Sequence, residues 1–223
     1  MRDFVASLLF GGVCFVCRGA AHELLCAACH AELPRLPSER CPRCALPTPL
    51  GAVCGRCLAE PPAYDATVAA LAYDFPADAL VHAFKFRGEL ALARFFARLL
   101  SSEIDRHAVD RVIPVPLSRA RLKTRGYNQA VEIARHLARG KIDLATCVRE
   151  GDAPPQMQLP WDERQRNVRG AFRCRTALAG ATVAVVDDVM TTGATLDELA
   201  RTLKRAGASR VVNWVVARTL PPS

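Results

Sequence analysis

The chain has 223 residues and a mass of 24.2 kDa, enough for one medium-sized domain and a small second one. Hydrophobic residues make up 51% of it, a composition typical of a globular protein and not of a disordered one. Aromatic residues make up only 6%, which argues against a surface built mainly for stacking many bases. The net charge of +8 and the pI near 9.2 favour phosphate-bearing partners, either small ligands or nucleic acid.

The first apolar run, at residues 4–16, is too short for a membrane helix, which needs roughly 20 residues. A secretory signal is disfavoured because Asp3 follows Arg2 directly and leaves no net positive start. We expect a short helix at residues 2–10 that packs on the main domain through Phe4 and Leu8. No later segment could span a bilayer, so we expect no membrane insertion.

Eight of the ten cysteines form four C-x-x-C pairs within residues 14–57. Such a pair places two thiolates on one turn, as tetrahedral zinc requires, and it indicates a reducing compartment, here the cytoplasm. Near-equal spacing favours a double zinc ribbon with two closed, structural four-thiolate sites made by consecutive pairs. A cross-brace joining the first pair to the third is the alternative. The predicted ligands are Cys14, Cys17, Cys26, Cys29, Cys41, Cys44, Cys54 and Cys57.

The sequence changes in character at Pro61 and Pro62, which predicts two domains, residues 1–60 and 61–223. The first has little material for a core, so metal must stabilise it. In the second we expect strands at residues 68–73, 111–115, 144–148, 183–186 and 211–217, and helices at residues 79–84, 90–106, 127–139 and 195–206. This alternation predicts an α/β fold with a doubly wound parallel sheet.

The most informative segment is V-A-V-V-D-D-V-M-T-T-G-A-T at residues 183–195. Four apolar residues predict a buried strand, with Asp187 and Asp188 at its carboxyl end, where open α/β sheets bind ligands. A loop of threonines and Gly193 then leads into a helix, whose N-terminal amides attract phosphate. Because adjacent carboxylates would repel phosphate, we expect them to face a sugar diol, with Mg²⁺ close by.

This segment resembles the phosphoribosyl-pyrophosphate loop of the type I phosphoribosyltransferase family. The resemblance implies that Asp187 and Asp188 hold the ribose hydroxyls of phosphoribosyl pyrophosphate, as binding and catalytic residues, with Mg²⁺ as a cofactor. It implies that the 5′-phosphate lies against Met190, Thr191, Thr192, Gly193, Ala194 and Thr195.

A basic segment follows the expected strand at residues 111–115, and we expect it to be a loop. Several cations would suit the pyrophosphate leaving group, which has many oxygens to pair. A solvated basic turn and a surface for a nucleic-acid backbone are the alternatives. The predicted pyrophosphate ligands are Arg119, Arg121, Lys123, Arg125 and Asn128.

Residues 150–169 are polar and rich in proline, and we expect a long loop there. Transfer at a sugar carbon passes through a cationic state that water would trap, so a loop that closes over the site would protect it. We expect Arg164 and Arg166 to act as catalytic contacts and Asn167 to reach phosphate. A basic loop without these contacts is the alternative.

Together with the C-x-x-C pairs, the motifs R-G-x-N-Q, R-N-x-R-G-A-F and D-D-V-M-T-T-G-A-T resemble the ComF family of competence proteins. The K-F-R-G element at residues 85–88 fits this resemblance as well. The resemblance implies a role in DNA uptake during natural transformation, on the cytoplasmic side of the membrane. Single-stranded DNA, a competence helicase and recombination-mediator proteins are the implied candidate partners.

Two functions remain open from the sequence. The first is a Mg²⁺-dependent phosphoribosyltransferase with an unidentified acceptor, which the intact carboxylate pair and threonine loop favour. The second is a non-catalytic protein on the same fold that binds single-stranded DNA or a nucleotide, which the net charge of +8 and the zinc module favour.

Overall fold

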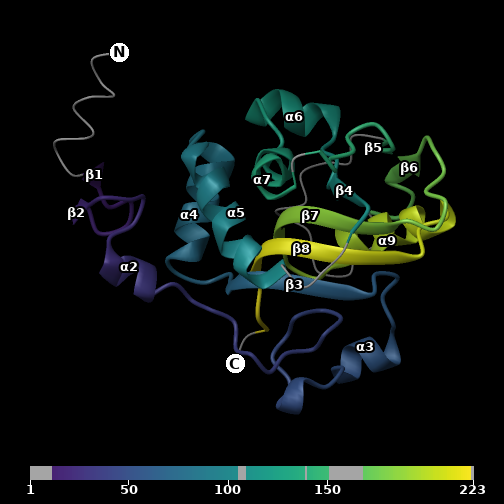
Figure 1. Cartoon of the computed structure of the whole chain (residues 1–223), viewed down its shortest axis with the longest axis horizontal. Coiled ribbons are helices and arrows are strands. Elements are labelled where there is room, and N and C mark those ends of the chain that lie inside the picture. Colours follow the sequence, from purple (N-terminus) through teal and green to yellow (C-terminus); the bar gives the residue numbers. More distant parts are fainter. Residues whose placement is uncertain (1–11, 105–108, 139, 151–167, 222–223) are drawn as a thin grey trace.

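The computed structural model describes residues 12–104, 109–138, 140–150 and 168–221. Its central sheet has four parallel strands in the order β3-β8-β7-β4 (Figure 1). These strands are β3 (Ala66–Ala72), β4 (Arg111–Pro114), β7 (Thr182–Met190) and β8 (Arg210–Arg218). The two central strands, β7 and β8, are buried along most of their length, as the apolar runs predict.

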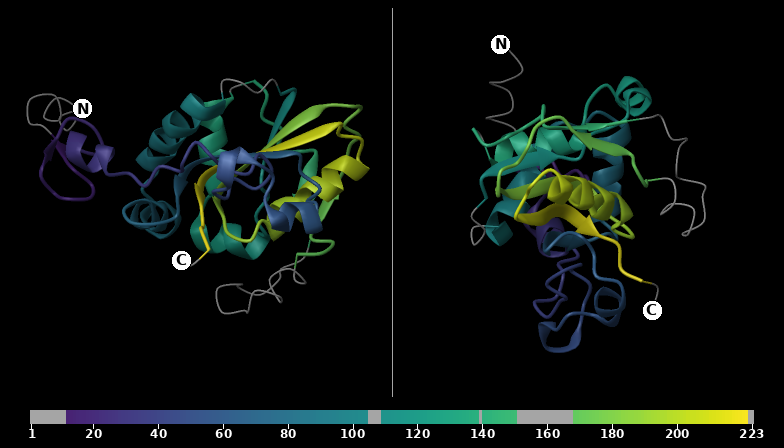
Figure 2. Two further views of the ribbon diagram at one scale, coloured as in Figure 1. Left: turned by 90° about the horizontal axis from the view of Figure 1, so that it is seen from below. Right: turned by 90° about the vertical axis from the view of Figure 1, so that its right-hand side faces the viewer.

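Helices cover both faces of this sheet, so the predicted doubly wound parallel fold is confirmed (Figure 2). One face packs against α4 (Ala77–Phe86), α5 (Ala91–Ile104) and α7 (Gln129–Leu137). The other face packs against α9 (Ala194–Arg205) and against the second group of cysteines. The predicted helices and strands of this sheet are therefore present, with bounds that differ by a few residues.

The basic segment expected to be a loop is instead a helix, α6 (Arg119–Arg125). The hydroxyl of Ser118 caps it by accepting a hydrogen bond from the Arg121 amide at 3.3 Å. Gly126 ends it in the left-handed region with φ 78°. The loop prediction was wrong because the repeated cations obscured these two end signals.

The strand expected at residues 144–148 lies outside the central sheet. It is β5 (Cys147–Arg149), which pairs antiparallel with β6 (Phe172–Cys174). The two remaining cysteines, Cys147 and Cys174, lie opposite each other in this pair, and burial raises the pKa of Cys147 to about 12. Burial raises the pKa of Cys174 as well, so both side chains favour the neutral thiol.

The N-terminal region makes two cysteine-containing turns at different places on the larger domain (Figure 1). The first contains β1 (Gly12–Val13), β2 (Ala20–Ala21) and α2 (Ala27–Ala31). The second contains the 3₁₀ turn η1 (Pro49–Gly51) and α3 (Gly55–Ala59). The chain between them lies along the edge of β3, where the Ala72 amide donates to the Pro34 carbonyl at 2.7 Å.

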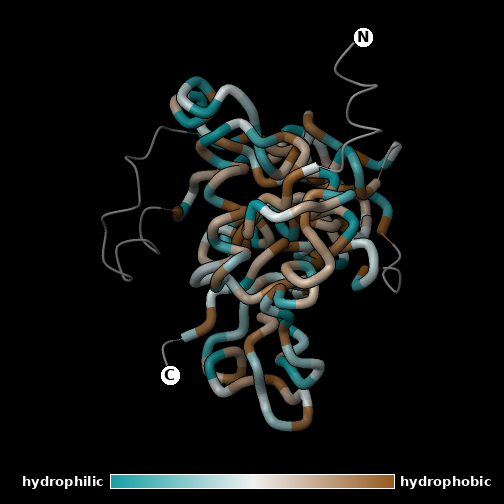
Figure 3. The backbone as a smooth tube through the Cα atoms, turned by 90° about the vertical axis from the view of Figure 1, so that its left-hand side faces the viewer, coloured by the Kyte–Doolittle hydropathy of each residue, from teal (hydrophilic) through white to brown (hydrophobic). Residues whose placement is uncertain are grey.

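In the lobe at the bottom of the view, which the second cysteine turn forms, the chain changes between hydrophilic and hydrophobic every few residues (Figure 3). This pattern fits a module that metal stabilises in place of a core. The expected helix at residues 2–10 and residues 151–167 of the expected loop lie outside the described residues. Among the residues described, no helix combines the length and the apolarity that a bilayer crossing demands.

Candidate functional site

Two adjacent carboxylates lie near the end of the central strand β7. Asp188 is only 6% exposed, and its carboxylate forms an ion pair with the Lys85 ammonium of α4 at 2.8 Å. The Asp188 amide donates to the Asp187 carboxylate at 2.9 Å. The strand continues through both residues to Met190 because β8 pairs with it over the same length, so the carboxylates sit on rigid backbone.

The two carboxylates differ in their ionisation. Burial, together with the charge of Asp188, raises the pKa of Asp187 to about 7, although Lys85 and Arg125 oppose this rise. Asp187 is therefore poised between its neutral and charged forms near neutral pH. A ligand that brings a cation or hydroxyl donors to this point would favour the charged form.

Three arginines join Lys85 around the carboxylate pair. Burial and the charge of Arg125 lower the pKa of Arg121, and the two carboxylates partly offset this effect. Burial and Arg121 also lower the pKa of Arg149, which interacts with Asp187 and lies 5.4 Å from the ring centre of Phe172. The buried Nε of Arg149 has no hydrogen-bond partner in the described part of the chain. This group of cations therefore has capacity left for an anion.

The four predicted pyrophosphate ligands on α6 lie on different sides of that helix. Arg121 and Arg125 are one helical turn apart and interact with the carboxylates, whereas Arg119 and Lys123 are exposed on other sides of the helix. The Asn128 side chain is occupied within the protein, since it caps α7 and donates to the Val115 carbonyl at 3.0 Å. Pyrophosphate binding by each of these residues stays a prediction.

The candidate phosphate loop, residues 190–195, connects β7 to α9. Gly193 adopts φ 89°, and a Cβ atom there would lie 2.7 Å from the Met190 Cε and 3.0 Å from the Tyr64 hydroxyl oxygen. The positive φ therefore favours glycine at this position, and any side chain there would also displace Met190 or Tyr64. The hydroxyl of Thr192 accepts a hydrogen bond from the Ala194 amide at 3.2 Å. The loop thus delivers the N-terminus of a helix of 12 residues to the end of the sheet that carries the carboxylates.

Arg164 and Arg166, predicted as catalytic contacts, lie outside the described residues with Asn167. Their roles stay predictions. Lys85 and Arg149, in contrast, were not among the predicted site residues, although the structure brings both to the carboxylates. For Lys85, the K-F-R-G motif was an available signal; for Arg149, nothing in the sequence shows that β5 brings this side chain near Asp187.

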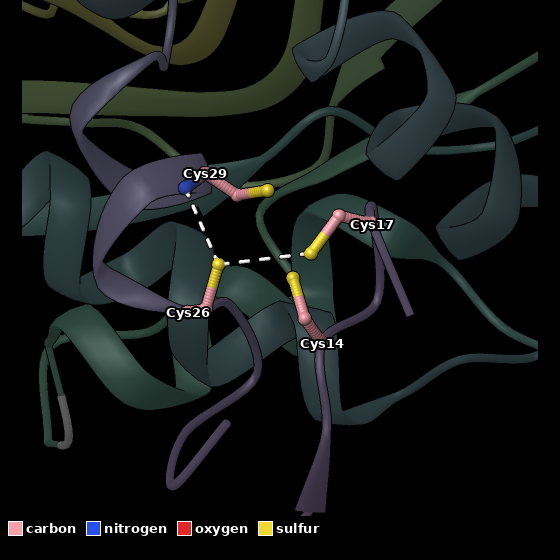
Figure 4. Close-up of side chains that lie close together, drawn as sticks. All are labelled: Cys14, Cys17, Cys26 and Cys29. Carbon is pink, nitrogen blue, oxygen red and sulfur yellow. Dashed lines mark hydrogen bonds between the residues drawn. The ribbon is translucent and has the colours of Figure 1, made fainter. Parts of the chain in front are cut away.

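The eight paired cysteines form two separate clusters, each made of consecutive pairs, so the sequential arrangement is confirmed and the cross-brace is wrong. In the first cluster, the four sulfur atoms turn toward one another (Figure 4). Sulfurs are 3.7 Å apart between Cys17 and Cys26, and 3.6 Å apart between Cys44 and Cys54. Four Zn–S bonds of about 2.3 Å in a tetrahedron place sulfurs about 3.8 Å apart, so both clusters fit zinc.

Backbone amides already favour thiolates in both clusters. The Cys26 amide, with others, lowers the pKa of Cys14 to about 6. Burial opposes ionisation of Cys41, but amides such as that of Cys54 lower its pKa to about 7. Burial and the neighbouring cysteines, however, raise the pKa of Cys29 to about 12. Four thiolates so close together therefore need a cation, which zinc would supply in a structural role.

Comparison with known proteins agrees with both halves of the structure. A family described as a double zinc ribbon domain matches residues 5–58, and one described as a phosphoribosyl transferase domain matches residues 122–219. The DNA utilization protein YhgH of Salmonella typhimurium is 35% identical over 94% of this chain and 98% of its own. Competence protein F of Haemophilus influenzae is 31% identical over 92% of this chain and 96% of its own. The chain belongs to the ComF family.

A more distant relative of this ComF-family chain is competence protein ComFC of Bacillus subtilis, which is 27% identical over 88% of this chain and 85% of its own. Among solved structures, a glutamine phosphoribosylpyrophosphate amidotransferase from B. subtilis matches 54% of this chain and 25% of its own, with 20% identity and a TM-score of 0.36.

We expect two zinc ions per chain, one in each cluster. Changing Cys17 and Cys26 to serine should reduce the zinc content to about one per chain, and changing Cys44 and Cys54 should do the same. Because the ligands must lose protons, zinc affinity should fall as the pH is lowered. Elemental analysis of purified protein measures the content. A folded wild-type protein without zinc would contradict this assignment.

We expect Asp187→Asn to stabilise the fold more at pH 8 than at pH 5. The pKa of Asp187 is about 7 in the folded protein, whereas in the unfolded chain the same carboxyl loses its proton near pH 4. Asp187 therefore destabilises the folded state increasingly as the pH rises from about 4 to about 7. The gain on substitution should grow to about pH 7 and then level off. Thermal unfolding at several pH values measures it.

Asp143→Asn is the matched control for this experiment. Burial opposes ionisation of Asp143, but hydrogen bonds from Thr146 and Arg111 lower its pKa below the ordinary value. Its stabilising contribution is lost only at lower pH, so the variant should lose the same stability at pH 5 and pH 8. Equal pH dependence in the two variants would refute the raised pKa of Asp187.

Proposed function

We propose that this chain binds phosphoribosyl pyrophosphate in the presence of Mg²⁺. The observation that carries the proposal is the arrangement at the end of β7, where a carboxylate pair, a phosphate-type loop and a group of cations meet. The 5′-phosphate would accept hydrogen bonds from the loop at residues 190–195. Asp187 and Asp188 would accept hydrogen bonds from the ribose hydroxyls, and Arg121 and Arg125 would pair with the pyrophosphate.

The chemistry that fits this arrangement is transfer of the phosphoribosyl group, with loss of pyrophosphate, to an acceptor that stays unidentified. No covalent nucleophile is needed, because positioning and charge stabilisation supply the catalysis. Cations that surround the leaving pyrophosphate would stabilise its developing charge, and Mg²⁺ would add to them. Arg164 and Arg166 stay predicted catalytic contacts.

We place this activity in DNA uptake on the cytoplasmic side of the membrane. Support comes from the names of two relatives, competence protein F and competence protein ComFC. The grouping of eight cysteines as metal ligands supports a reducing compartment. A competence helicase and recombination-mediator proteins remain candidate partners.

A second function, binding of single-stranded DNA, is favoured by one surface next to the site. Phe86 is 50% exposed, its ring lies 4.8 Å from the His82 ring, and the Arg125 guanidinium lies 5.4 Å from its centre. An exposed aromatic ring beside a cation is the kind of platform on which a base stacks. The exposed cations Arg119 and Lys123 of α6 would meet the phosphate backbone of the same strand.

The proposed ligand position predicts whether neutralising the two carboxylates weakens or strengthens phosphoribosyl pyrophosphate binding. Asp187→Asn combined with Asp188→Asn removes two charged hydrogen-bond acceptors. A hydrogen bond to a charged group is worth roughly 1.5–3 kcal/mol, so phosphoribosyl pyrophosphate should bind at least about tenfold more weakly. A site that contacted only phosphate would bind more tightly after losing two negative charges. Thr192→Val should also weaken binding, by removing a hydroxyl without changing the charge. Titration calorimetry with Mg²⁺ measures all variants.

Glu23→Gln combined with Glu32→Gln is the control, because it changes the net charge equally at two exposed residues of the first cysteine turn. It should leave the affinity unchanged. Unchanged or tighter binding by the double asparagine variant would refute the proposed ligand position. Release of labelled pyrophosphate in the presence of an added acceptor would separate transfer from binding alone.

The DNA-binding function predicts that affinity for single strands falls steeply with salt and depends little on sequence. Lys123→Glu should weaken binding and reduce the salt dependence, and Phe86→Ala should weaken binding by about fivefold to a hundredfold through lost stacking. Phe75→Ala, at an aromatic residue that is 65% exposed, is the control and should have no effect. Fluorescence anisotropy with labelled oligonucleotides measures these affinities. Absence of binding at low salt would exclude this function.

A further inference from the structure

The second cysteine cluster and the phosphate loop both contribute to the lining of a pocket of about 510 Å³. Arg56 and Cys57 of α3 line it together with Thr192 and Gly193. The cluster is thus a neighbour of the proposed ligand site as well as a support for its own short segment. Two buried side chains, Arg218 and Tyr64, connect the two.

Arg218 makes the polar connection. It lies opposite Met190 in the β7–β8 pairing, and it is 1% exposed. Its Nε donates to the Cys44 carbonyl at 2.8 Å, and its Nη1 donates to the Met190 carbonyl at 2.9 Å and to the Thr191 carbonyl. One guanidinium therefore holds the backbone of a metal-binding turn and the backbone of the phosphate loop together.

The charge of Arg218 suits this position. Burial lowers its pKa, and the nearby Cys44 opposes that effect. A zinc ion with four thiolates is net negative, because four thiolates outweigh one divalent ion, so a loaded cluster compensates a buried guanidinium. Lysine could not replace it, since an ammonium lacks the planar fork that reaches carbonyls on two segments.

Tyr64 makes the apolar connection. It is 3% exposed and packs in one core cluster with Cys44, Cys57 and Met190. Its hydroxyl oxygen lies 3.0 Å from where a Cβ of Gly193 would be, so the ring limits the space available to the loop. Beside it, the Ala63 amide donates to the Asp197 carboxylate in the first turn of α9 at 2.6 Å.

The first cysteine cluster is connected to a different part of the molecule. Its segment contacts α5, through an ion pair between Glu23 and Arg98 at 3.6 Å and through the rings of His30 and Phe95, 6.2 Å apart. The segment of the second cluster also contacts α5, through the Arg40–Glu103 ion pair at 2.7 Å. The two clusters nevertheless differ in their cores: the second packs in the core cluster that contains Met190, and the first packs in the other one. They therefore provide a comparison within one chain.

We propose that zinc in the second cluster positions the phosphate loop, and that zinc in the first cluster does not. Arg218 and Tyr64 are the positioning residues that transmit the effect. Loss of metal at Cys41, Cys44, Cys54 and Cys57 would release the Cys44 turn, and the carbonyls of Met190 and Thr191 would then lose their fixed partner. The expected effect of this zinc on phosphoribosyl pyrophosphate binding rests on the proposed function.

The test compares hydrogen exchange of the loop amides, residues 190–196, in the full-length, zinc-loaded protein and two matched variants. Cys44→Ser with Cys54→Ser should speed exchange in the loop by about tenfold or more, because the loop loses hydrogen bonds that restrain it. Cys17→Ser with Cys26→Ser should leave exchange in the loop unchanged. Zinc content is measured in each sample. Unchanged exchange in the first variant, or equal acceleration in both, would overturn the proposal.

Arg218→Lys keeps all eight cysteine ligands, so it tests the Arg218 contacts without removing zinc and unfolding the second cysteine turn. We expect it to retain two zinc ions, to speed loop exchange and to weaken phosphoribosyl pyrophosphate binding by about tenfold. Arg210→Lys, at the exposed start of the same strand, is the control and should change none of these. Loop exchange equal to wild type in Arg218→Lys would overturn the proposal.

The exchange and calorimetry readouts separate this proposal from the proposed function. If wild-type protein binds no phosphoribosyl pyrophosphate but its loop responds to zinc loss as expected, the positioning stands and the ligand assignment fails. If wild type binds the ligand and loss of the second zinc changes neither exchange nor affinity, the ligand assignment stands and the positioning fails.

Discussion

The in-register parallel pairing of β7 with β8 is the constraint on which the candidate site depends. It places Asp187 opposite Val215 and Met190 opposite Arg218, so a buried strand ends in two carboxylates and a loop. A shift of one residue would turn each side chain to the other face of the sheet. The hydrophobic cores on both faces prevent such a shift, because β7 and β8 contribute apolar side chains to each.

Charge is concentrated at this end of the sheet in a way that a fold alone would not require. Two adjacent carboxylates repel each other, and burial raises the pKa of Asp187 further. Lys85 and Arg121 reduce that repulsion, yet Arg149 retains a buried Nε without a partner in the described residues. Such a balance favours a ligand that carries both hydroxyl donors and anionic groups.

The cysteine clusters can stabilise short segments that have little hydrophobic core of their own, and these segments also pack against the cores of the larger domain. The short turns at residues 12–60 bury few apolar side chains, so zinc must hold each of them. Both turns nevertheless join the cores of the larger domain, the first through Leu25 and Leu33 and the second through Cys44. The linker between them pairs with β3 at the edge of the sheet, where the backbone groups of β3 would otherwise lack hydrogen-bond partners.

The sequence by itself determined the local features: the two cysteine clusters, the order of strands and helices, and the carboxylate pair followed by a threonine loop. These follow from spacing and hydrophobic periodicity, which act over a few residues. It did not predict α6, whose end signals at Ser118 and Gly126 lay among cations. Only the tertiary structure brought Arg149 to the carboxylates and joined Arg218 to the second cluster, because these contacts depend on which distant elements pack side by side.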